Sequence, residues 1–242
     1  AYTAMEMTVH KLMQVYEKNV DMMIAPSAFV RDTFVEFGQD SNKIVTIPHF
    51  VDPVFLEKAK SIPAQSDKDP YMLYFGRLAK EKGIEKLLEM VYIYKPKLRL
   101  KVAGTGPLET SLKDFVKHRG LESRVEFLGH LSAEQLIGQI KGAACVVMPS
   151  RFLEPFGFAA LETMALGTPL VASASGALSE IVPSDLGRLF PRDDRDAMAK
   201  AIEEVSDWDR QTVIRAGEAL IKEHYLPQTH YDALMTVYRK LL

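Results

Sequence analysis

The chain has 242 residues, of which 47% are hydrophobic and 26% are charged, and its formal net charge at pH 7 is -2. This length allows one large domain or two small ones with a sizeable core, and the composition is ordinary for a globular protein. The near-zero charge gives no support to general nucleic-acid binding, so we expect no nucleic-acid partner. No run of about 18 apolar residues is present, as a membrane-spanning helix would need.

The chain contains a single cysteine, Cys145, which excludes an internal disulfide and a cysteine-based metal site. A lone cysteine in an apolar stretch fits the reducing cytosol, so we expect a cytoplasmic protein. The six histidines show no ligand spacing, and we therefore expect no metal and no cofactor.

The first 70 residues alternate between short elements. Apolar residues at helical spacing predict a helix over residues 1–18. A strand is expected at 20–25, a helix from about 28 to 37 and a strand at 44–47. Because the sequence begins at Ala1, directly in helical sequence, we expect it to be a piece of something longer. Residues 52–70 carry three prolines among polar residues and predict a connection between domains.

A regular alternation of strands and helices begins at residue 71. This pattern predicts a doubly wound parallel sheet of the α/β class, Rossmann-like and covered by helices on both faces. Strands are expected at 71–75, 98–103, 125–128, 144–148, 170–173 and 187–190, and helices near 82–94, 107–119, 132–141, 157–166, 194–206, 209–224 and 228–242.

The segment from 150 to 162 is the most informative part of the chain. It places Glu154 in a turn just before Pro155-Phe156-Gly157, and Glu162 inside the helix that follows. Free backbone amides then meet a carboxylate at a helix N-terminus above a strand end, where an open α/β sheet binds phosphorylated ligands. A carboxylate repels phosphate but accepts hydrogen bonds from sugar hydroxyls, so the segment predicts a nucleotide-sugar site. Taken alone, two such glutamates are more typical of a solvated helix surface, and the Pro-Phe-Gly turn is what favours the functional interpretation.

Two cations follow the first strand of the predicted sheet. Arg77 and Lys82 fall in its strand-to-helix loop, after Gly76. Arginine offers a planar fork to phosphate oxygens and lysine a mobile point charge, so together they could neutralise a diphosphate without a metal. Taken alone, such a pair also fits two solvated surface cations.

Small residues mark three further loops at the same sheet edge. Gly104 and Gly106 form a turn that lacks the third glycine and the acidic partner of a dinucleotide fingerprint, so it is a weak NAD signal and instead leaves room for a ligand. The loop Gly129-His130-Leu131 could meet a base, although a plain loop histidine explains it equally well. Ser175-Gly176 forms another small turn, and Glu180 after it fits a surface charge or a supporting role.

These motifs, in this order, resemble the retaining nucleotide-sugar glycosyltransferases of family 4, which have the GT-B architecture. The matching stretches are 75–78 with 81–83, 103–107, 127–129, 149–150, 154–162 and 165–169, together with Pro26-Ser27 and 47–52 nearer the N-terminus. The chain departs from the family at Ser175-Gly176, where a glycine pair is common.

The resemblance implies a role for each site residue. Arg77 and Lys82 would hold the donor diphosphate, Glu162 the ribose hydroxyls, and Glu154 would face the transferred sugar. The amides of Phe156, Gly157 and Phe158 would meet the sugar and phosphate, and the loop 129–131 would contact the base. Gly76, Gly104 and Gly106 would line the donor site.

The resemblance also implies a division of the chain. Residues 1–52 would be the end of an N-terminal acceptor domain and the hinge, residues 53–226 the donor-binding domain, and residues 227–242 a helix that crosses back to the N-terminal domain. The chain would be the donor half of a hexosyltransferase that moves a sugar from a nucleoside diphosphate to an acceptor hydroxyl with retained configuration, as in polysaccharide biosynthesis.

Three alternatives remain open. The chain could be a nucleotide-sugar-binding module inactive alone, a related disaccharide phosphorylase or synthase, or an NAD-dependent oxidoreductase, which the missing fingerprint disfavours.

The expected partners are a UDP- or GDP-sugar donor and a sugar or lipid-linked acceptor. Peripheral membrane association would come through the missing part of the N-terminal domain. The apolar stripes of the first and last helices are expected to pack on each other or to form a homodimer contact. They comprise Met5, Val9, Leu12 and Met13, and Leu234, Val237 and Leu241.

Overall fold

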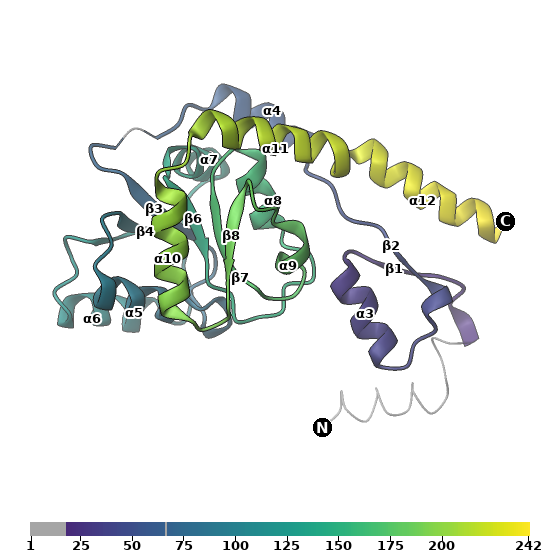
Figure 1. Ribbon diagram of the computed structural model, residues 1–242, viewed down its shortest axis with the longest axis horizontal. Helices are drawn as coiled ribbons and strands as arrows, with labels where there is room; N and C mark the ends of the chain where they lie inside the picture. The colour runs from purple at the N-terminus through teal and green to yellow at the C-terminus, as the bar shows by residue number, and fades with distance from the viewer. Residues whose placement is uncertain (1–17, 66) are drawn as a thin grey trace.

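The larger part of the protein is a six-stranded sheet with helices on both faces, as Figure 1 shows for the computed structural model, which describes residues 18–65 and 67–242. The strand order is β5-β4-β3-β6-β7-β8 and every neighbouring pair is parallel. The expected α/β class with a doubly wound parallel sheet is therefore confirmed. The strands are β3 (Tyr71–Phe75), β4 (Arg99–Ala103), β5 (Val125–Gly129), β6 (Cys145–Met148), β7 (Leu170–Ser173) and β8 (Gly187–Phe190).

The core consists of two apolar layers, one on each face of this sheet. Met72 and Tyr74 of β3 point into one layer, and Tyr71 and Leu73 into the other, because successive strand residues face opposite sides. Helices α5 (Ile84–Tyr94), α6 (Glu109–His118) and α10 (Arg195–Ser206) cover the first layer, and α7 (Ala133–Gly142), α8 (Phe158–Ala165), α9 (Leu178–Ile181) and α11 (Arg210–His224) the second. Burial on both faces explains why the central strands β3 and β6 are apolar throughout their sequence.

The strand order reverses between β3 and β6. The chain runs from β3 outward to β4 and β5, and then returns to the other side of β3 as β6. Ligands of open α/β sheets bind outside the carboxyl ends of the strands at such a reversal. The loops that follow Phe75 and Met148 lie at that position.

A small second unit precedes the sheet. It contains β1 (Met23–Ala25), α3 (Ala28–Glu36), the 3₁₀ turn η1 (Ser41–Lys43) and β2 (Ile44–Thr46), with β1 and β2 paired in parallel. In Figure 1 this purple-to-blue unit lies beside the end of the large sheet that carries α9. The helix expected over residues 1–18 lies, apart from its last residue, outside the described residues.

The segment 52–70, expected to connect two domains, contains in its first half a helix that was not predicted, α4 (Pro53–Ser61). The side chain of Asp52 accepts a hydrogen bond from the amide of Val54 at 2.8 Å and caps this helix. A proline in the first helical position starts a helix rather than interrupting one, because its missing N–H would have no acceptor there. Ala59 is buried in the layer that α7 also supplies, so α4 belongs to the packed structure.

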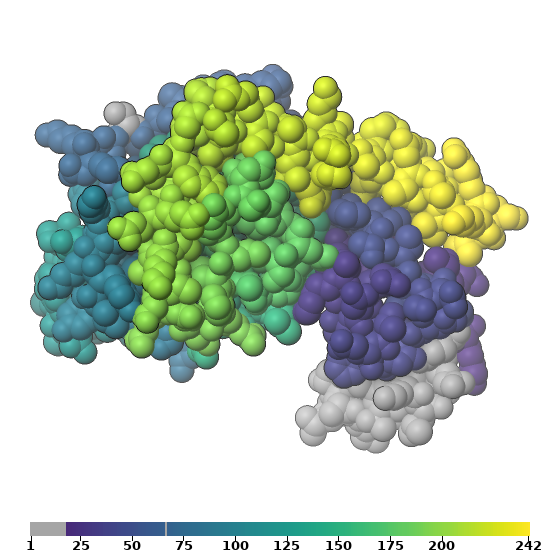
Figure 2. All heavy atoms as spheres, in the orientation of Figure 1, coloured from purple at the N-terminus to yellow at the C-terminus, as the bar shows by residue number. Residues whose placement is uncertain are grey.

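The last helix, α12 (Pro227–Leu241), continues from α11 toward the small unit, and in Figure 2 its yellow surface meets the blue surface of that unit. A ring nitrogen of His230 lies 2.7 Å from the carbonyl oxygen of Pro48. Val237 of the predicted stripe is buried, while Leu241 is 47% exposed. The residues of the other stripe lie outside the described part, so the pairing of the two stripes stays a prediction. Over the residues that the structure describes, no helix is both long and apolar enough to cross a membrane.

Candidate functional site

An ion pair joins the two loops at the reversal of the strand order. Lys82, in the 3₁₀ turn η2 (Lys80–Lys82) after β3, places its Nζ 2.6 Å from Oε1 of Glu154, in the loop after β6. The hydroxyl of Ser150 donates to the same oxygen at 3.0 Å. The side chain of Glu154 is only 12% exposed, whereas that of Lys82 is 34% exposed. The lysine and the acid that the sequence assigns to the diphosphate and to the sugar are thus direct neighbours.

Backbone contacts fix the distance between these loops. The amides of Arg151 and Phe152 both donate to the carbonyl oxygen of Glu81, at 2.8 and 3.0 Å. Gly83 has φ +71°, and a Cβ there would lie 1.8 Å from the carbonyl oxygen of Pro149. Only glycine allows this approach, so the backbone itself holds Lys82 beside Glu154.

Buried serines support the loop that carries Glu154. Ser173, at the end of β7, donates to the carbonyl oxygen of Ser150 at 2.6 Å, and Ser175 donates to that of Phe152 at 2.6 Å. The supporting roles of Ser150 and Ser173 were not predicted from the sequence. Each is a small polar residue at or just beyond the end of a buried strand, and such residues are too common to identify this role.

A hollow of about 550 Å³ lies over the ends of β3, β4 and β5. It is lined by Arg77, the other predicted cation, and by the glycine turns. Gly76, Arg77, Gly104, Gly106, His130 and Leu131 all line it, so the structure brings these six predicted residues together. Gly129 lies at their edge, where its carbonyl oxygen accepts from the amide of Gly104 at 2.7 Å. The loops after β3 and β4 also approach closely, because a Cβ on Gly104 would lie 2.0 Å from the carbonyl oxygen of Gly76.

The turn before α8 has the geometry that the sequence predicts. Gly157 precedes the helix with φ +95°, and Phe158 opens it. The first amides of a helix have no acceptor within the helix and carry a partial positive charge, which favours an anion. The ring of Phe156 is buried, whereas Phe158 is 50% exposed. The amides of this turn, rather than the Phe156 side chain, are therefore the groups available to a ligand.

Glu162 lines a second hollow, of about 410 Å³, between α8 and the segment 49–52. Burial and the nearby carboxylate of Asp52 raise the pKa of Glu162. The ring of His49 stacks on that of Phe158, with 5.0 Å between the ring centroids. Burial is the main cause that lowers the pKa of His49, and the neighbouring ring of His230 lowers it further. His49 also lines this hollow. No role was predicted for its side chain, although the resemblance implies that its segment is part of a hinge.

The structure brings some of the predicted groups together and leaves others apart. Arg77 lines the hollow at the ends of β3, β4 and β5, and Lys82 and Glu154 form the ion pair, whereas Glu162 lines a separate hollow beside residues 49–52. Within the described ranges, no group of three or more His, Cys, Asp or Glu side chains is placed to hold a metal ion. The expectation that no metal or cofactor is needed stays a prediction.

The protein has an open parallel α/β sheet with a glycine-lined hollow and cations at the reversal of its strand order, an arrangement typical of nucleotide-binding domains. Comparison with known proteins gives the family. Residues 57–219 match the family described as glycosyl transferases group 1, and the chain belongs to it. It is 34% identical over 172 residues to an uncharacterized glycosyltransferase of Methanocaldococcus jannaschii, covering 69% of this chain and 43% of the relative. It is also 34% identical over 192 residues to glycogen synthase of Mycobacterium tuberculosis, covering 74% of this chain and 44% of the relative.

Solved structures show the same architecture. Sucrose-phosphate synthase from Thermosynechococcus elongatus superposes with a TM-score of 0.79 at 27% identity, over 93% of this chain and 59% of that one. Anabaena HepE in complex with UDP-glucose superposes with a TM-score of 0.75 at 21% identity, over 94% of this chain and 66% of that one, which shows the shared fold. The chain spans less than half the length of the two curated relatives above.

Proposed function

We propose that this chain carries the donor-binding half of a retaining family 4 glycosyltransferase. In the intact enzyme a sugar would pass from a nucleoside diphosphate to an acceptor hydroxyl with its anomeric configuration retained. The observation that carries the proposal is the ion pair between Lys82 and Glu154 at the reversal of the strand order. The hollow lined by Arg77 and the glycine turns lies at the same edge of the sheet. A diphosphate needs cations and a sugar needs acceptors, and the pair offers one of each at the same point.

In this proposal the diphosphate lies between Arg77, Lys82 and the first amides of α8. Negative charge grows on the diphosphate as the sugar departs, and preorganised positive groups stabilise that charge most in the transition state. Lys82 is already oriented by Glu154 and does not have to be ordered when the donor arrives. The catalytic roles of Glu154, Arg77 and Lys82 therefore rest on position and charge, with no covalent step.

The base would occupy the hollow beside His130 and Leu131, and the ribose hydroxyls would bind Glu162. A raised pKa suits Glu162 for this role, because a carboxylate that has lost part of its hydration gains more from donors that a ligand brings. A UDP-sugar donor is supported by the fold shared with HepE, whose solved complexes contain UDP and UDP-glucose. A GDP-sugar remains the second candidate, since one relative is named as a GDP-mannose-dependent mannosyltransferase.

Thermal unfolding with added nucleotides tests the proposal. At a hundredfold excess over its dissociation constant, UDP or GDP stabilises the folded chain by about 2.7 kcal/mol through mass action. NAD is expected to have no effect. A shift of the melting temperature with NAD, and none with UDP or GDP, would overturn the proposal in favour of the oxidoreductase alternative.

A further inference from the structure

The N-terminus of α3 is completed by a residue from the other unit. The carboxylate of Glu180, in α9, accepts hydrogen bonds from the amides of Ala28 and Phe29 at 3.1 and 3.3 Å. These are the first two amides of α3, which have no acceptor within the helix. The amide of Val30 is bound by the hydroxyl of Ser27 at 3.2 Å. The charge of Glu180 also lies at the positive end of the helix dipole, where a carboxylate is favoured.

A second bond joins α3 to the loop of Glu154. The buried hydroxyl of Ser27 donates to the carbonyl oxygen of Pro155 at 2.6 Å. Pro155 directly follows Glu154. The small unit is therefore hydrogen-bonded to the backbone next to the acid that is proposed to face the sugar.

Helix α9, which carries Glu180, also packs on the loop of Glu154. The amide of Ala177, the N-cap residue of α9, donates to the carbonyl oxygen of Glu154 at 2.8 Å. A Cβ on Gly157 would lie 2.8 Å from the side chain of Leu178 and 3.1 Å from that of Ile181, so α9 leaves no free space against the turn. Movement of α3 relative to α9 would therefore be transmitted to residues 154–157.

We propose that Glu180 is a positioning residue that latches the small unit onto the donor half and thereby fixes the loop of Glu154. The proposal rests on the role given to Glu154 under the proposed function. Opening the small unit would break the bonds of Glu180 and of Ser27 together. This frees the carbonyl oxygen of Pro155, next to Glu154, while the bonds of the Glu154 side chain to Lys82 and Ser150 stay in place. The latch thus couples the arrangement of the two units to the geometry at the transferred sugar.

Residue-resolved amide exchange by NMR tests the latch without any ligand. Glu180→Ala should raise the exchange rates of Ala28 and Phe29 by about tenfold, since their charged acceptor is lost. Glu180→Gln should raise them less, because the amide oxygen still accepts. In both variants the amides of Ala177 and of the 154–158 loop should exchange several-fold faster than in the unaltered chain. The increase should again be larger in Glu180→Ala than in Glu180→Gln. Glu218→Ala, at an exposed position of α11, is the matched control and should change neither set.

Two results would overturn the proposal. One is unchanged exchange at Ala28 and Phe29 in Glu180→Ala. The other is faster exchange confined to α3, which would make Glu180 a helix cap with no influence on the donor loop.

A calorimetric arm separates this proposal from the proposed function. Titration with UDP and UDP-glucose, and with GDP and GDP-mannose, should show Glu180→Ala weakening the nucleotide sugar several-fold relative to the nucleotide. If no nucleotide binds even the unaltered chain, the proposed function fails, whereas the exchange rates still decide whether the latch exists. If both ligands bind and lose affinity equally, the link from Glu180 to Glu154 is wrong.

Discussion

Removing the cation of the Lys82–Glu154 pair should destabilise the chain measurably. Breaking a fully buried ion pair costs about 3–5 kcal/mol, and exposed pairs contribute about 0.2–1 kcal/mol. With side chains 34% and 12% exposed, this pair lies between those limits. We expect Lys82→Met to lower the free energy of unfolding by about 2 kcal/mol, after discounting for the partly exposed lysine.

Differential scanning calorimetry provides the assay, because about 2 kcal/mol corresponds to roughly 4–8 °C in a domain of this size. Lys80→Met is the matched control, since Lys80 lies in the same 3₁₀ turn and is exposed. A double-mutant cycle with Glu154→Gln should give a coupling energy of about 1–2 kcal/mol. Equal shifts for the Lys82 and Lys80 variants, or a coupling energy near zero, would refute the reasoning.

Three further predictions concern single residues of the site. Glu162→Gln should weaken binding of free UDP or GDP, whereas Glu154→Gln should weaken only the nucleotide sugar; calorimetry that finds equal losses for both variants with both ligands would contradict these roles. Because burial and Asp52 raise the pKa of Glu162, its charge costs stability once the pH rises above the ordinary range of a glutamate, so Glu162→Gln should raise the melting temperature at pH 7 and leave it unchanged at about pH 4. An equal effect at both pH values would show that the charge is not the cause. Gly83→Ala should lower the free energy of unfolding, measured with urea, by more than about 3 kcal/mol, because its Cβ would lie 1.8 Å from a carbonyl oxygen. Gly120→Ala should lower it by only about 1 kcal/mol through backbone strain, because Gly120 has φ +63° but open space around it.

The sheet and its loops could be predicted from the sequence because their signals are local. Most strands are short stretches rich in apolar residues, and β3 and β4 are each followed directly by glycine. In a parallel sheet the carboxyl ends of all strands meet at one edge. That is why Gly76, Arg77, Gly104, Gly106 and His130 were expected at one site and line one hollow. The helix α4 was not predicted, because three prolines in a polar stretch were interpreted as a connection between domains. The Asp52-Pro53 pair, which is typical of a helix start, was not recognised as one.

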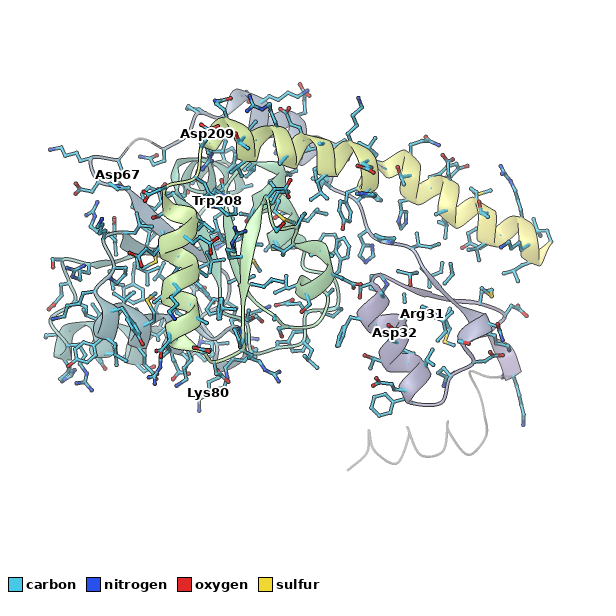
Figure 3. All side chains as sticks on the ribbon, viewed as in Figure 1. Arg31, Asp32, Asp67, Lys80, Trp208 and Asp209 are labelled. Atoms are coloured by element: carbon cyan, nitrogen blue, oxygen red, sulfur yellow. The ribbon has the colours of Figure 1, made fainter. Side chains whose placement is uncertain are left out.

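The contacts between distant segments could not be predicted. The bond of Lys82 to Glu154 spans 72 residues, and that of Glu180 to Ala28 spans 152. The sequence shows that Lys82, Glu154 and Glu180 are charged, but not which partner each one meets. The packing of the loops after β3 and β6 brings Lys82 to Glu154, and the packing of α9 beside α3 brings Glu180 to Ala28. Figure 3 labels Trp208 and Asp209, which are adjacent in sequence at the junction of α10 and α11 but have different roles. Trp208 packs on both core layers, whereas Asp209 caps the next helix by accepting from the amide of Thr212 at 2.9 Å.

The most direct test of the central claim is a crystal structure of this chain with a bound nucleoside diphosphate, UDP or GDP. The proposal predicts the base beside His130 and Leu131, the ribose on Glu162, and the diphosphate between Arg77, Lys82 and the first amides of α8. A nucleotide bound elsewhere, or a diphosphate that touches neither Arg77 nor Lys82, would contradict the account of the site.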